Sequence, residues 1–572
     1  MRRLAKLVVA FMVLTAISSC GGGGGSSTQA PPPAVTVSVS PGTANVLAGA
    51  SATFSATVQN TTNSAVTWEV GGTAGGNSTV GTISASGVYT APKLPPSAGT
   101  TTITAVSQAD SSKSGTATVT IQFSNASIQG PYAFSFSGFN ANGDFSLAGS
   151  FQADGAGNIT NGLEDLNGGA GLFTNLSFAG TYSVGTDGRG AAMITDSNGT
   201  TNFHFVVIAS GQAQIVEFDA SENGNGTVVP QDTSALNLTS LAGNWSFFLS
   251  GTGATGEIIG DAGAFSFDSA GVITQGVEDY NDGGTVTADA SFTGAATNAT
   301  SNGRGTVSFT SSTGTSTFAY YVVSANQVFV VETDTSPSLS GAAYKQPGTT
   351  FTNSSLSGTY TFLLAGADAV GLVADVGQVA ADGNGNITSG VFDENEAGTA
   401  VLDQSLTGTY TVASNGRGTA TLTSAAGTTN YAFYLVSPKL TIFVQTDSFA
   451  VTEGLAELQS GAPFANSSVF GSYGFDATGL TSTGGTNIVG QLVSGGSGSY
   501  TGVEDANEGT TLTPGLSFSG TYTISSTGRG TAQLVESGTT SSFVVYVISP
   551  SSFVLLEIDP SEVITGFANT QF

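Results

Sequence analysis

The sequence predicts an all-β fold class, with one β-sandwich followed by four tandem antiparallel β-barrel or sandwich repeats. Charged residues make up only 9% of the 572 residues while 80 are glycines, and this composition suits short strands and tight turns better than long surface helices. Apolar and polar residues alternate over short runs that end in Asn-Gly or Asp-Gly, as they do in antiparallel hairpins. A Gly-x-aromatic strand opener recurs four times along the chain, which indicates internal repeats.

The N-terminus carries the features of an export signal. Three basic residues within the first six positions precede an apolar run at 7–17, which is too short to span a bilayer. The run ends in Ile-Ser-Ser-Cys20, which resembles the lipobox of bacterial lipoproteins. The resemblance implies that residues 1–19 are a lipoprotein signal peptide and that Cys20 is lipidated. Residues 20–33, rich in Gly, Ser and Pro, are expected to form a tether.

Composition and the lipobox together limit the partners. Lys and Arg total 11 against 39 Asp and Glu, a formal net charge of −28, so we expect no nucleic acid partner. One Cys and one His exclude disulfide frameworks and the common zinc sites, and we expect no metal and no cofactor. The lipobox resemblance implies a cell-envelope localisation, at the outer membrane or cell surface, with the membrane contacted through the lipid on Cys20.

The first folded segment is predicted at 34–122. Short runs of alternating Val and Thr bounded by Gly, Pro and Asn indicate about seven strands. This stretch resembles the bacterial Ig-like domains of surface proteins, which implies a β-sandwich that acts as a spacer or adhesive stalk. Trp68 stands where such sandwiches bury an aromatic side chain on a central strand.

From Phe123 onward the chain repeats itself. The openers place their aromatic residues 113, 115 and 113 positions apart, at Tyr132, Trp245, Tyr360 and Tyr473. The four β repeats are therefore 123–234, 235–350, 351–463 and 464–572.

Each repeat is expected to contain seven or eight antiparallel strands joined by Asn-Gly and Asp-Gly turns. The Gly-x-Trp/Tyr opener is similar to the one in lipocalin-type barrels, which implies a closed barrel. Because a closed barrel leaves no strand edge exposed, we favour a barrel over a sandwich. A β-propeller is disfavoured, since each repeat is more than twice the length of one blade.

Three sets of polar residues recur once per repeat. An Arg stands in each Gly-Arg-Gly, at Arg189, Arg304, Arg417 and Arg529. An Asp lies in the middle of each repeat, two positions before an Asn, at Asp165, Asp279, Asp393 and Asp505. Another Asp lies on a strand near the end of each repeat, at Asp219, Asp334, Asp447 and Asp559.

These recurring residues have two interpretations. They form either a binding constellation present four times, or structural pairs in which each Arg forks onto a carboxylate across the strands of its own barrel. We favour the structural pair, because such pairs are commoner. It predicts that Arg417→Met destabilises the third repeat alone.

Metal-binding and catalytic patterns are weaker. The segment Asp382-Gly-Asn-Gly-Asn386 echoes a calcium loop, but Ile387 stands where that loop needs Gly, so we favour a hairpin turn. His204 is the only histidine, the other repeats have Ala or Val in its place, and no nucleophile elbow lies near it.

Glycoside hydrolysis would need paired carboxylates. Such pairs would recur from repeat to repeat, which is ordinary for a scaffold and unusual for an active site. We therefore expect that the protein is not an enzyme. The hydrolase hypothesis is tested by changing the three candidate acids to Gln, namely Glu164, Glu278 and Glu504.

Two functions fit these expectations. The first is a non-enzymatic, lipid-anchored cell-surface protein that displays repeated β-modules for adhesion or envelope interaction, with a polysaccharide or another surface protein as partner. Tandem copies would add avidity to weak contacts. The alternative is a carrier of small apolar ligands in lipocalin-like barrels, since eight strands leave space for one small ligand or for side chains alone.

Overall fold

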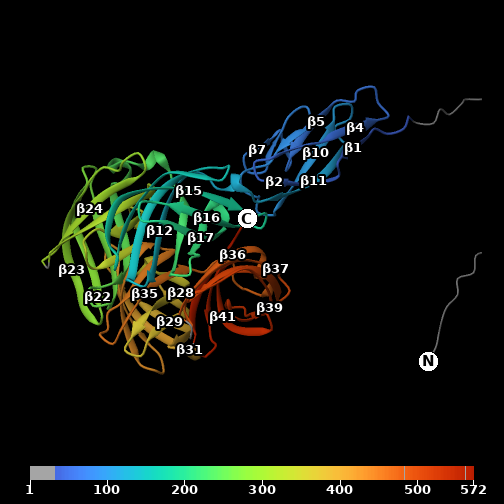
Figure 1. The fold of residues 1–572 in the computed structure, drawn as a ribbon. Helices are drawn as coiled ribbons and strands as arrows, with labels where there is room; N and C mark the ends of the chain where they lie inside the picture. The colour runs from blue at the N-terminus through green and yellow to red at the C-terminus, as the bar shows by residue number, and fades with distance from the viewer. Residues whose placement is uncertain (1–31, 313, 349, 482–483, 561) are drawn as a thin grey trace, which may run out of the picture.

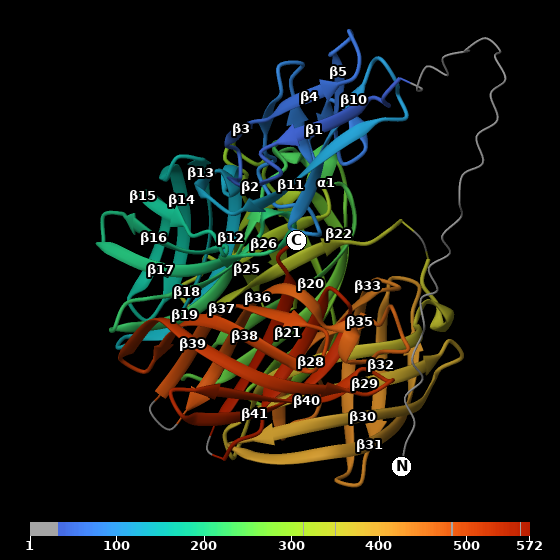
Figure 2. The same ribbon diagram turned by 90° about the vertical axis from the view of Figure 1, so that its right-hand side faces the viewer.

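The computed structural model describes residues 32–572, apart from 313, 349, 482–483 and 561. It confirms the all-β class: four closed eight-stranded barrels follow a group of small N-terminal sheets. The barrels are arranged around a ring, and the N-terminal sheets project from the side of barrel 1, beside the C-terminus (Figures 1 and 2). The expected signal peptide and Cys20 lie outside the described residues.

Three small sheets pack on one apolar core in the N-terminal unit, and Trp68 on β5 is buried in it. One sheet pairs β1 (Thr36–Ser40) with β4 (Ser55–Gln59). A second has the order β2 (Thr43–Leu47), β11 (Ser114–Gln122), β10 (Thr100–Ser107), β5 (Val66–Val70), β6 (Thr73–Ala74). The third has the order β3 (Ser51–Thr53), β9 (Val88–Thr90), β8 (Gly81–Ile83), β7 (Gly76–Asn77).

Each barrel is a meander in which every strand pairs antiparallel with the next and the first pairs with the eighth, so the barrel interpretation of the repeats is confirmed. Barrel 1 consists of β12 (Gln129–Asn140), β13 (Gly143–Asp154), β14 (Asn158–Gly168), β15 (Gly171–Val184), β16 (Arg189–Thr195), β17 (Thr200–Val207), β18 (Ala213–Glu217) and β19 (Glu222–Pro230). Barrel 2 consists of β20 (Gly243–Thr252), β21 (Ile258–Phe267), β22 (Val272–Asp282), β23 (Thr285–Ala296), β24 (Arg304–Thr310), β25 (Thr315–Ser324), β26 (Gln327–Glu332) and β27 (Ser338–Lys345).

The last two barrels have the same topology. Barrel 3 consists of β28 (Ser357–Asp368), β29 (Leu372–Asp382), β30 (Asn386–Glu396), β31 (Thr399–Val412), β32 (Arg417–Thr423), β33 (Thr428–Ser437), β34 (Leu440–Gln445) and β35 (Ala450–Leu458). Barrel 4 consists of β36 (Phe470–Thr481), β37 (Gly484–Gly495), β38 (Ser499–Glu508), β39 (Thr511–Ile524), β40 (Arg529–Glu536), β41 (Thr539–Ser549), β42 (Ser552–Glu557) and β43 (Val563–Thr570).

A short helical turn closes one end of each barrel. In barrel 3 the turn is η4 (Asn353–Ser355), and the Tyr410 hydroxyl reaches across the barrel to donate to the carbonyl oxygen of Leu356 at 2.7 Å. In barrel 2 the same place is taken by α1 (Leu238–Leu241), whose Leu241 carbonyl accepts the indole N–H of Trp245. The equivalent turns in barrels 1 and 4 are η1 (Asn125–Ser127) and η5 (Asn466–Ser468). Two further short turns are η2 (Ala209–Gly211) and η3 (Thr233–Ala235).

The two glycines of the Gly-Arg-Gly motif are required for different structural reasons. Gly416 has φ +90°, a conformation that other L-residues rarely adopt, and it turns the chain into β32. Gly418 faces the barrel interior, where the ring of Phe433 on the neighbouring strand occupies the place that a Cβ atom would need. An aromatic ring lies over the equivalent glycine in barrels 1 and 2 as well.

We expect Gly418→Ala to lower the unfolding free energy by about 1–3 kcal/mol, because the added methyl group overpacks the barrel against Phe433. Urea unfolding of the full chain measures the change. Gly348→Ala is the matched control, since nothing lies within 4 Å of a Cβ atom there. Equal effects of the two substitutions would contradict this account of the motif.

The four barrels meet in a head-to-tail manner. The second strand of each barrel (β13, β21, β29 or β37) packs on the last three strands of the following barrel, and β37 of barrel 4 packs on β17, β18 and β19 of barrel 1. Repeated heterologous contacts generate a ring when the rotation closes, and here it closes at four barrels. Apolar clusters occupy the interfaces between barrels 1 and 2, 2 and 3, and 3 and 4, and a smaller one, with Val206, Val216 and Val489, joins barrel 4 to barrel 1.

Candidate functional site

The mid-repeat Asp, the Gly-Arg-Gly arginine and a Tyr come together between barrels. Asp279 of barrel 2 accepts two hydrogen bonds from Arg417 of barrel 3, from Nε and Nη2, both at 2.7 Å. The hydroxyl of Tyr434, also in barrel 3, donates to the same carboxylate at 2.5 Å. The Asp279 side chain is fully buried and the Arg417 side chain is 17% exposed. We call this Asp–Arg–Tyr arrangement a clasp.

Two further interfaces have the same clasp. Asp165 of barrel 1 accepts from Arg304 Nε at 2.6 Å and Nη2 at 2.7 Å, and from the Tyr321 hydroxyl at 2.5 Å. Asp393 of barrel 3 accepts from Arg529 and Tyr546 of barrel 4 at 2.6–2.8 Å. Burial and the neighbouring carboxylate raise the pKa of each clasp tyrosine far above its usual value, so the hydroxyls stay protonated as donors.

The interface that joins barrel 4 to barrel 1 differs. Asp505 accepts a single bond from Arg189, through Nη1 at 3.0 Å, because the Arg189 Nε is turned to Asp187. Val206 occupies the position of the clasp tyrosine, and His204 on the same strand places Nδ1 3.4 Å from Asp505 instead. The His204 ring stacks on Phe218 with centroids 3.7 Å apart. His204 therefore lies at the interface between barrels 4 and 1, where it contacts Asp505 and Phe218.

These contacts correct the expected pairing. We expected each Arg to fork onto a carboxylate of its own barrel, whereas Arg304, Arg417 and Arg529 each bind the Asp of the preceding barrel and Arg189 binds that of barrel 4. The expectation that Arg417→Met affects the third repeat alone is therefore wrong, because its partner Asp279 belongs to barrel 2.

The Asp near the end of each repeat has a separate role inside its own barrel. Asp447 accepts from the backbone N–H of Asn430 at 2.7 Å and from its side chain at 2.9 Å, which ties the β33 strand to the loop after β34. The equivalent carboxylates accept from the backbone N–H groups of Asn202, Thr317 and Ser542, and they are Asp219, Asp334 and Asp559. All four lie just after a strand and not, as predicted, on it. These residues do not join the clasps.

Two recurring amides, an Asn and a Gln, complete the interfaces. The Asn two positions after each clasp Asp donates to backbone carbonyls of the next barrel; Asn281, for example, donates to Gln445, Asp447 and Ala450. A Gln just after the last strand of each barrel does the same, and it was not predicted although it recurs every 112 to 115 residues. This set is Gln231, Gln346, Gln459 and Gln571.

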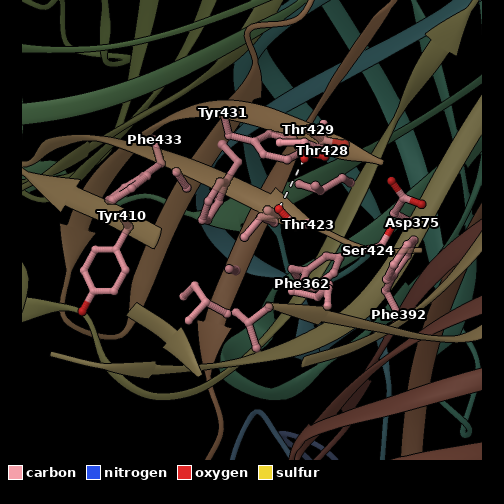
Figure 3. Close-up of a pocket in the computed structure, with 18 of the residues that line it drawn as sticks. Phe362, Asp375, Phe392, Tyr410, Thr423, Ser424, Thr428, Thr429, Tyr431 and Phe433 are labelled. Carbon is pink, nitrogen blue, oxygen red and sulfur yellow. Dashed lines mark hydrogen bonds between the residues drawn. The ribbon is translucent and has the colours of Figure 1, made fainter. Parts of the chain in front are cut away.

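The barrel interiors contain cavities of unequal size. Barrel 1 encloses about 580 Å³, barrel 4 about 390 Å³ and barrel 3 about 250 Å³, whereas barrel 2 retains about 50 Å³. In barrel 3 the walls are mainly aromatic and aliphatic, with Tyr410 toward the closed end and the hairpin Thr423–Thr428 at the mouth (Figure 3). Asp375 and Glu394 are the only charged groups among the residues that line it.

Phe309 is one of two large side chains that distinguish the filled barrel. Phe309 of barrel 2 stands in the interior with its ring centroid 4.6 Å from that of Phe292 and 5.3 Å from that of Phe318. The strand register places smaller residues at the same position in the other barrels, namely Ile194, Leu422 and Leu534. Phe267 is the second, because the register places Ala153, Ala381 and Ser494 at its position in the other barrels.

Buried carboxyl groups lie among these apolar walls. In barrel 1, burial raises the pKa of Glu164 to about 8 and that of Glu217 to about 10, helped by neighbouring carboxyls. In barrel 4, burial and Glu536 raise the pKa of Glu504 to about 9. Without a bound cation these groups are protonated at neutral pH, and they act there as hydrogen-bonding groups of an apolar cavity.

The candidate calcium loop is a turn whose carboxylate is hydrogen-bonded by groups of the same turn. The Asp382 carboxylate accepts from the backbone N–H groups of Asn384 and Asn386 and from the Asn386 side chain, and these bonds lower its pKa to about 2. Within the described part of the chain, no group of three or more acidic, His or Cys side chains is placed to hold a metal ion. No helix in that part has the length and apolarity needed to cross a membrane.

Comparison with known proteins adds little. No family model and no curated protein matches the sequence. Among solved structures, kievitone hydratase from Nectria haematococca aligns at 7% identity and a TM-score of 0.16, over 60% of this chain and 93% of that one. The FrpB iron transporter of Neisseria meningitidis (F3-3 variant) aligns at 8% identity and a TM-score of 0.11, over 82% and 87%. At such scores neither likeness bears on the fold or function of this chain.

Proposed function

We propose that this protein is a non-enzymatic carrier of small, mainly apolar ligands, held one each in barrels 1, 3 and 4. The observation that supports this function is the set of three cavities of about 250–580 Å³, each closed at one end. Binding sites for small molecules are typically mostly apolar hollows with a few polar groups that orient the ligand. The three barrels fit this description and barrel 2 does not.

The adhesion role that the sequence favoured receives less support. Its recurring polar residues were candidates for contact with a polysaccharide or a surface protein. The clasps hold the Arg and mid-repeat Asp side chains at interfaces inside the ring, where a large partner has no access to the carboxylates. Envelope interaction through other surfaces would use the ring as a rigid display of four modules.

Polysaccharide hydrolysis is also disfavoured by the geometry. Glu164 and Glu504 line the interiors of barrels 1 and 4, and each of these barrels is closed at one end by a helical turn bonded to a tyrosine. A polymer chain has no path through such a barrel. We therefore keep the proposal that the protein is not an enzyme.

The location belongs to the same proposal. The lipobox resemblance at Cys20 supports a lipid-anchored protein of the cell envelope, and residues 20–33 would hold the folded part away from the membrane. The Ig-like resemblance of 34–122 supports a role as spacer between tether and ring. Metabolic labelling with a palmitate analogue tests the anchor, with Cys20→Ser as the variant that loses the label.

Ligand binding is tested with N-phenyl-1-naphthylamine, whose fluorescence rises in apolar surroundings. We expect saturable binding to the full chain, and a marked loss of it in the triple variant Ile194→Phe, Leu422→Phe, Leu534→Phe, which places a phenyl ring at the Phe309 position of the other three barrels. The matched control combines Phe309→Leu with Phe267→Ala, which is expected to add a site in barrel 2.

Two results would contradict the carrier function. One is the absence of saturable binding by the wild-type chain. The other is unchanged binding in the triple variant with unfolding midpoints equal to wild type, since the dye would then lie outside the barrels.

A further inference from the structure

Barrels 1 and 4 share an arrangement of carboxyl groups that barrels 2 and 3 lack. In barrel 1, Glu217 at the end of β18 lies beside Glu222 at the start of β19, and Glu164 on β14 lies near Asp196. The corresponding residues of barrel 4 are all Glu: Glu504, Glu536, Glu557 and Glu562. The second member of each pair is replaced by Ser311 and Pro337 in barrel 2, and by Ser424 and Ala450 in barrel 3.

The Glu217 carboxyl contacts that of Glu222, but one of its oxygen atoms is left without a partner inside the cavity. Glu217 is 1% exposed and lines the interior of barrel 1, and its Oε1 atom makes no hydrogen bond with any described residue. A buried carboxyl oxygen with no partner is costly, and in a binding cavity a ligand group is the natural donor to it. In barrel 4 the Glu536 Oε1 atom, which lines that cavity, is likewise without a partner among the described residues.

The rest of the lining favours a cation. Neither cavity has a Lys, Arg or His among its lining residues, so no protein cation neutralises the carboxyls. Aromatic rings stand around them: in barrel 1, Phe136 and Phe203 meet edge to face with centroids 5.5 Å apart. Aromatic faces attract ammonium groups, and a carboxylate beside them adds a charge-assisted hydrogen bond.

We propose that barrels 1 and 4 bind organic cations, namely a protonated amine on an apolar or aromatic body, with Glu217 and Glu557 as the principal acceptors. The inference rests on the carrier function and adds the chemical class of the ligand. Barrel 3 has Gln445 at the Glu217 position, and the two carboxyls that line its cavity, Asp375 and Glu394, stand at other positions of the barrel.

The protons balance in a defined way. The amine enters with its ammonium proton and donates it in a hydrogen bond to the carboxylate. Because burial raises the pKa of Glu217 to about 10 and that of Glu557 to about 8 in the empty barrels, the carboxyl must ionise on binding. Each bound amine therefore releases about one proton to solvent at pH 7, and its affinity rises with pH until either the carboxyl of the empty barrel ionises or the free amine loses its proton.

The test compares 1-naphthylmethylamine with 1-naphthylmethanol, which has the same ring but no charge. Titration calorimetry of the full chain at pH 7, in two buffers of different ionisation enthalpy, measures affinity and proton release together. We expect the amine to bind about tenfold more tightly than the alcohol, with proton release for the amine alone. Glu217→Gln together with Glu557→Gln should abolish this preference and leave alcohol binding in place.

Glu332→Gln is the control, since Glu332 holds the same position in barrel 2 but does not line its small cavity. It should leave both affinities unchanged. Equal binding of amine and alcohol, or an amine preference that survives the double substitution, overturns the cation inference and leaves the carrier function standing. Failure of both probes to bind overturns both.

Discussion

Asp279→Ala is expected to lower the free energy of unfolding by about 3–5 kcal/mol, because it leaves a largely buried charge without its partner. The substitution removes both acceptors of the Arg417 guanidinium and the acceptor of the Tyr434 hydroxyl in one step. Denaturant unfolding of the full chain measures the loss. Faster hydrogen exchange in β21 and β33, the strands that meet at this interface, would locate it between barrels 2 and 3.

The neighbouring Asp289 supplies a matched control. Its Oδ1 lies 3.6 Å from the Arg417 Nε, but its side chain is 68% exposed. Asp289→Asn should change stability by less than about 0.5 kcal/mol, because exposed ion pairs contribute little and Asn tolerates the positive φ of this position, as Asn175 does in barrel 1. If Asp279→Ala has no larger effect than Asp289→Asn, the clasp does not hold the barrels together.

A double substitution separates the contribution of the Asp279–Arg417 ion pair from the cost of leaving one charge unpaired. Replacing Asp279 by Leu and Arg417 by Met together should recover much of the loss, since a buried ion pair is often no more stabilising than apolar residues of similar size. At the interface between barrels 4 and 1, Asp505→Ala should have a smaller effect than Asp279→Ala. Asp505 has a single bond from Arg189 and no tyrosine, so fewer groups lose their partner.

The Asp and Arg of the clasp recur once per repeat, and this recurrence made them visible in the sequence. Comparison of the four repeats found the Arg and both Asp sets, because residues that hold the structure recur while loops drift. It could not tell a contact within one repeat from a contact between successive repeats, since both recur with the same period. Arg417 was therefore assigned to its own barrel, although it binds Asp279 of the barrel before it.

The barrel topology was predictable and the cavities were not. Alternating strands and Asn-Gly turns predicted a meander of seven or eight strands, and closure was favoured over a sandwich because a closed barrel leaves no strand edge exposed. Cavity size depends on the summed volume of the side chains that point into the barrel from all its strands. Phe309 in barrel 2 and Leu422 in barrel 3 are both apolar, and only the strand register shows that they occupy the same interior position. The interface glutamines, such as Gln346, could have been predicted from the sequence, because one recurs after the last strand of each repeat.

Stability is expected to fall as the pH rises from 5 to 8, the reverse of ordinary acid denaturation. Burial raises the pKa of each of nine carboxyls to about 7 or higher, against about 4 in an unfolded chain. Between those two pKa values the folded chain holds protons that the unfolded chain has lost. Each such group therefore lowers the unfolding free energy by about 1.4 kcal/mol per pH unit.

Two of these groups alone lower the unfolding free energy by about 5 kcal/mol between pH 5 and pH 7, so the unfolding midpoint in urea should be clearly higher at pH 5. Carboxyl groups whose pKa is lowered in the folded chain have the opposite effect on stability, and only in stronger acid. Burial raises the pKa of Asp505, but the contacts with His204 and Arg189 lower it by more, and its contribution is lost only as the pH falls below about 4. Replacing Glu164 and Glu217 by Gln should make the pH slope shallower, because the amides do not titrate. A midpoint that rises from pH 5 to pH 8 would mean that water or a bound cation keeps these carboxyls ionised inside the barrels.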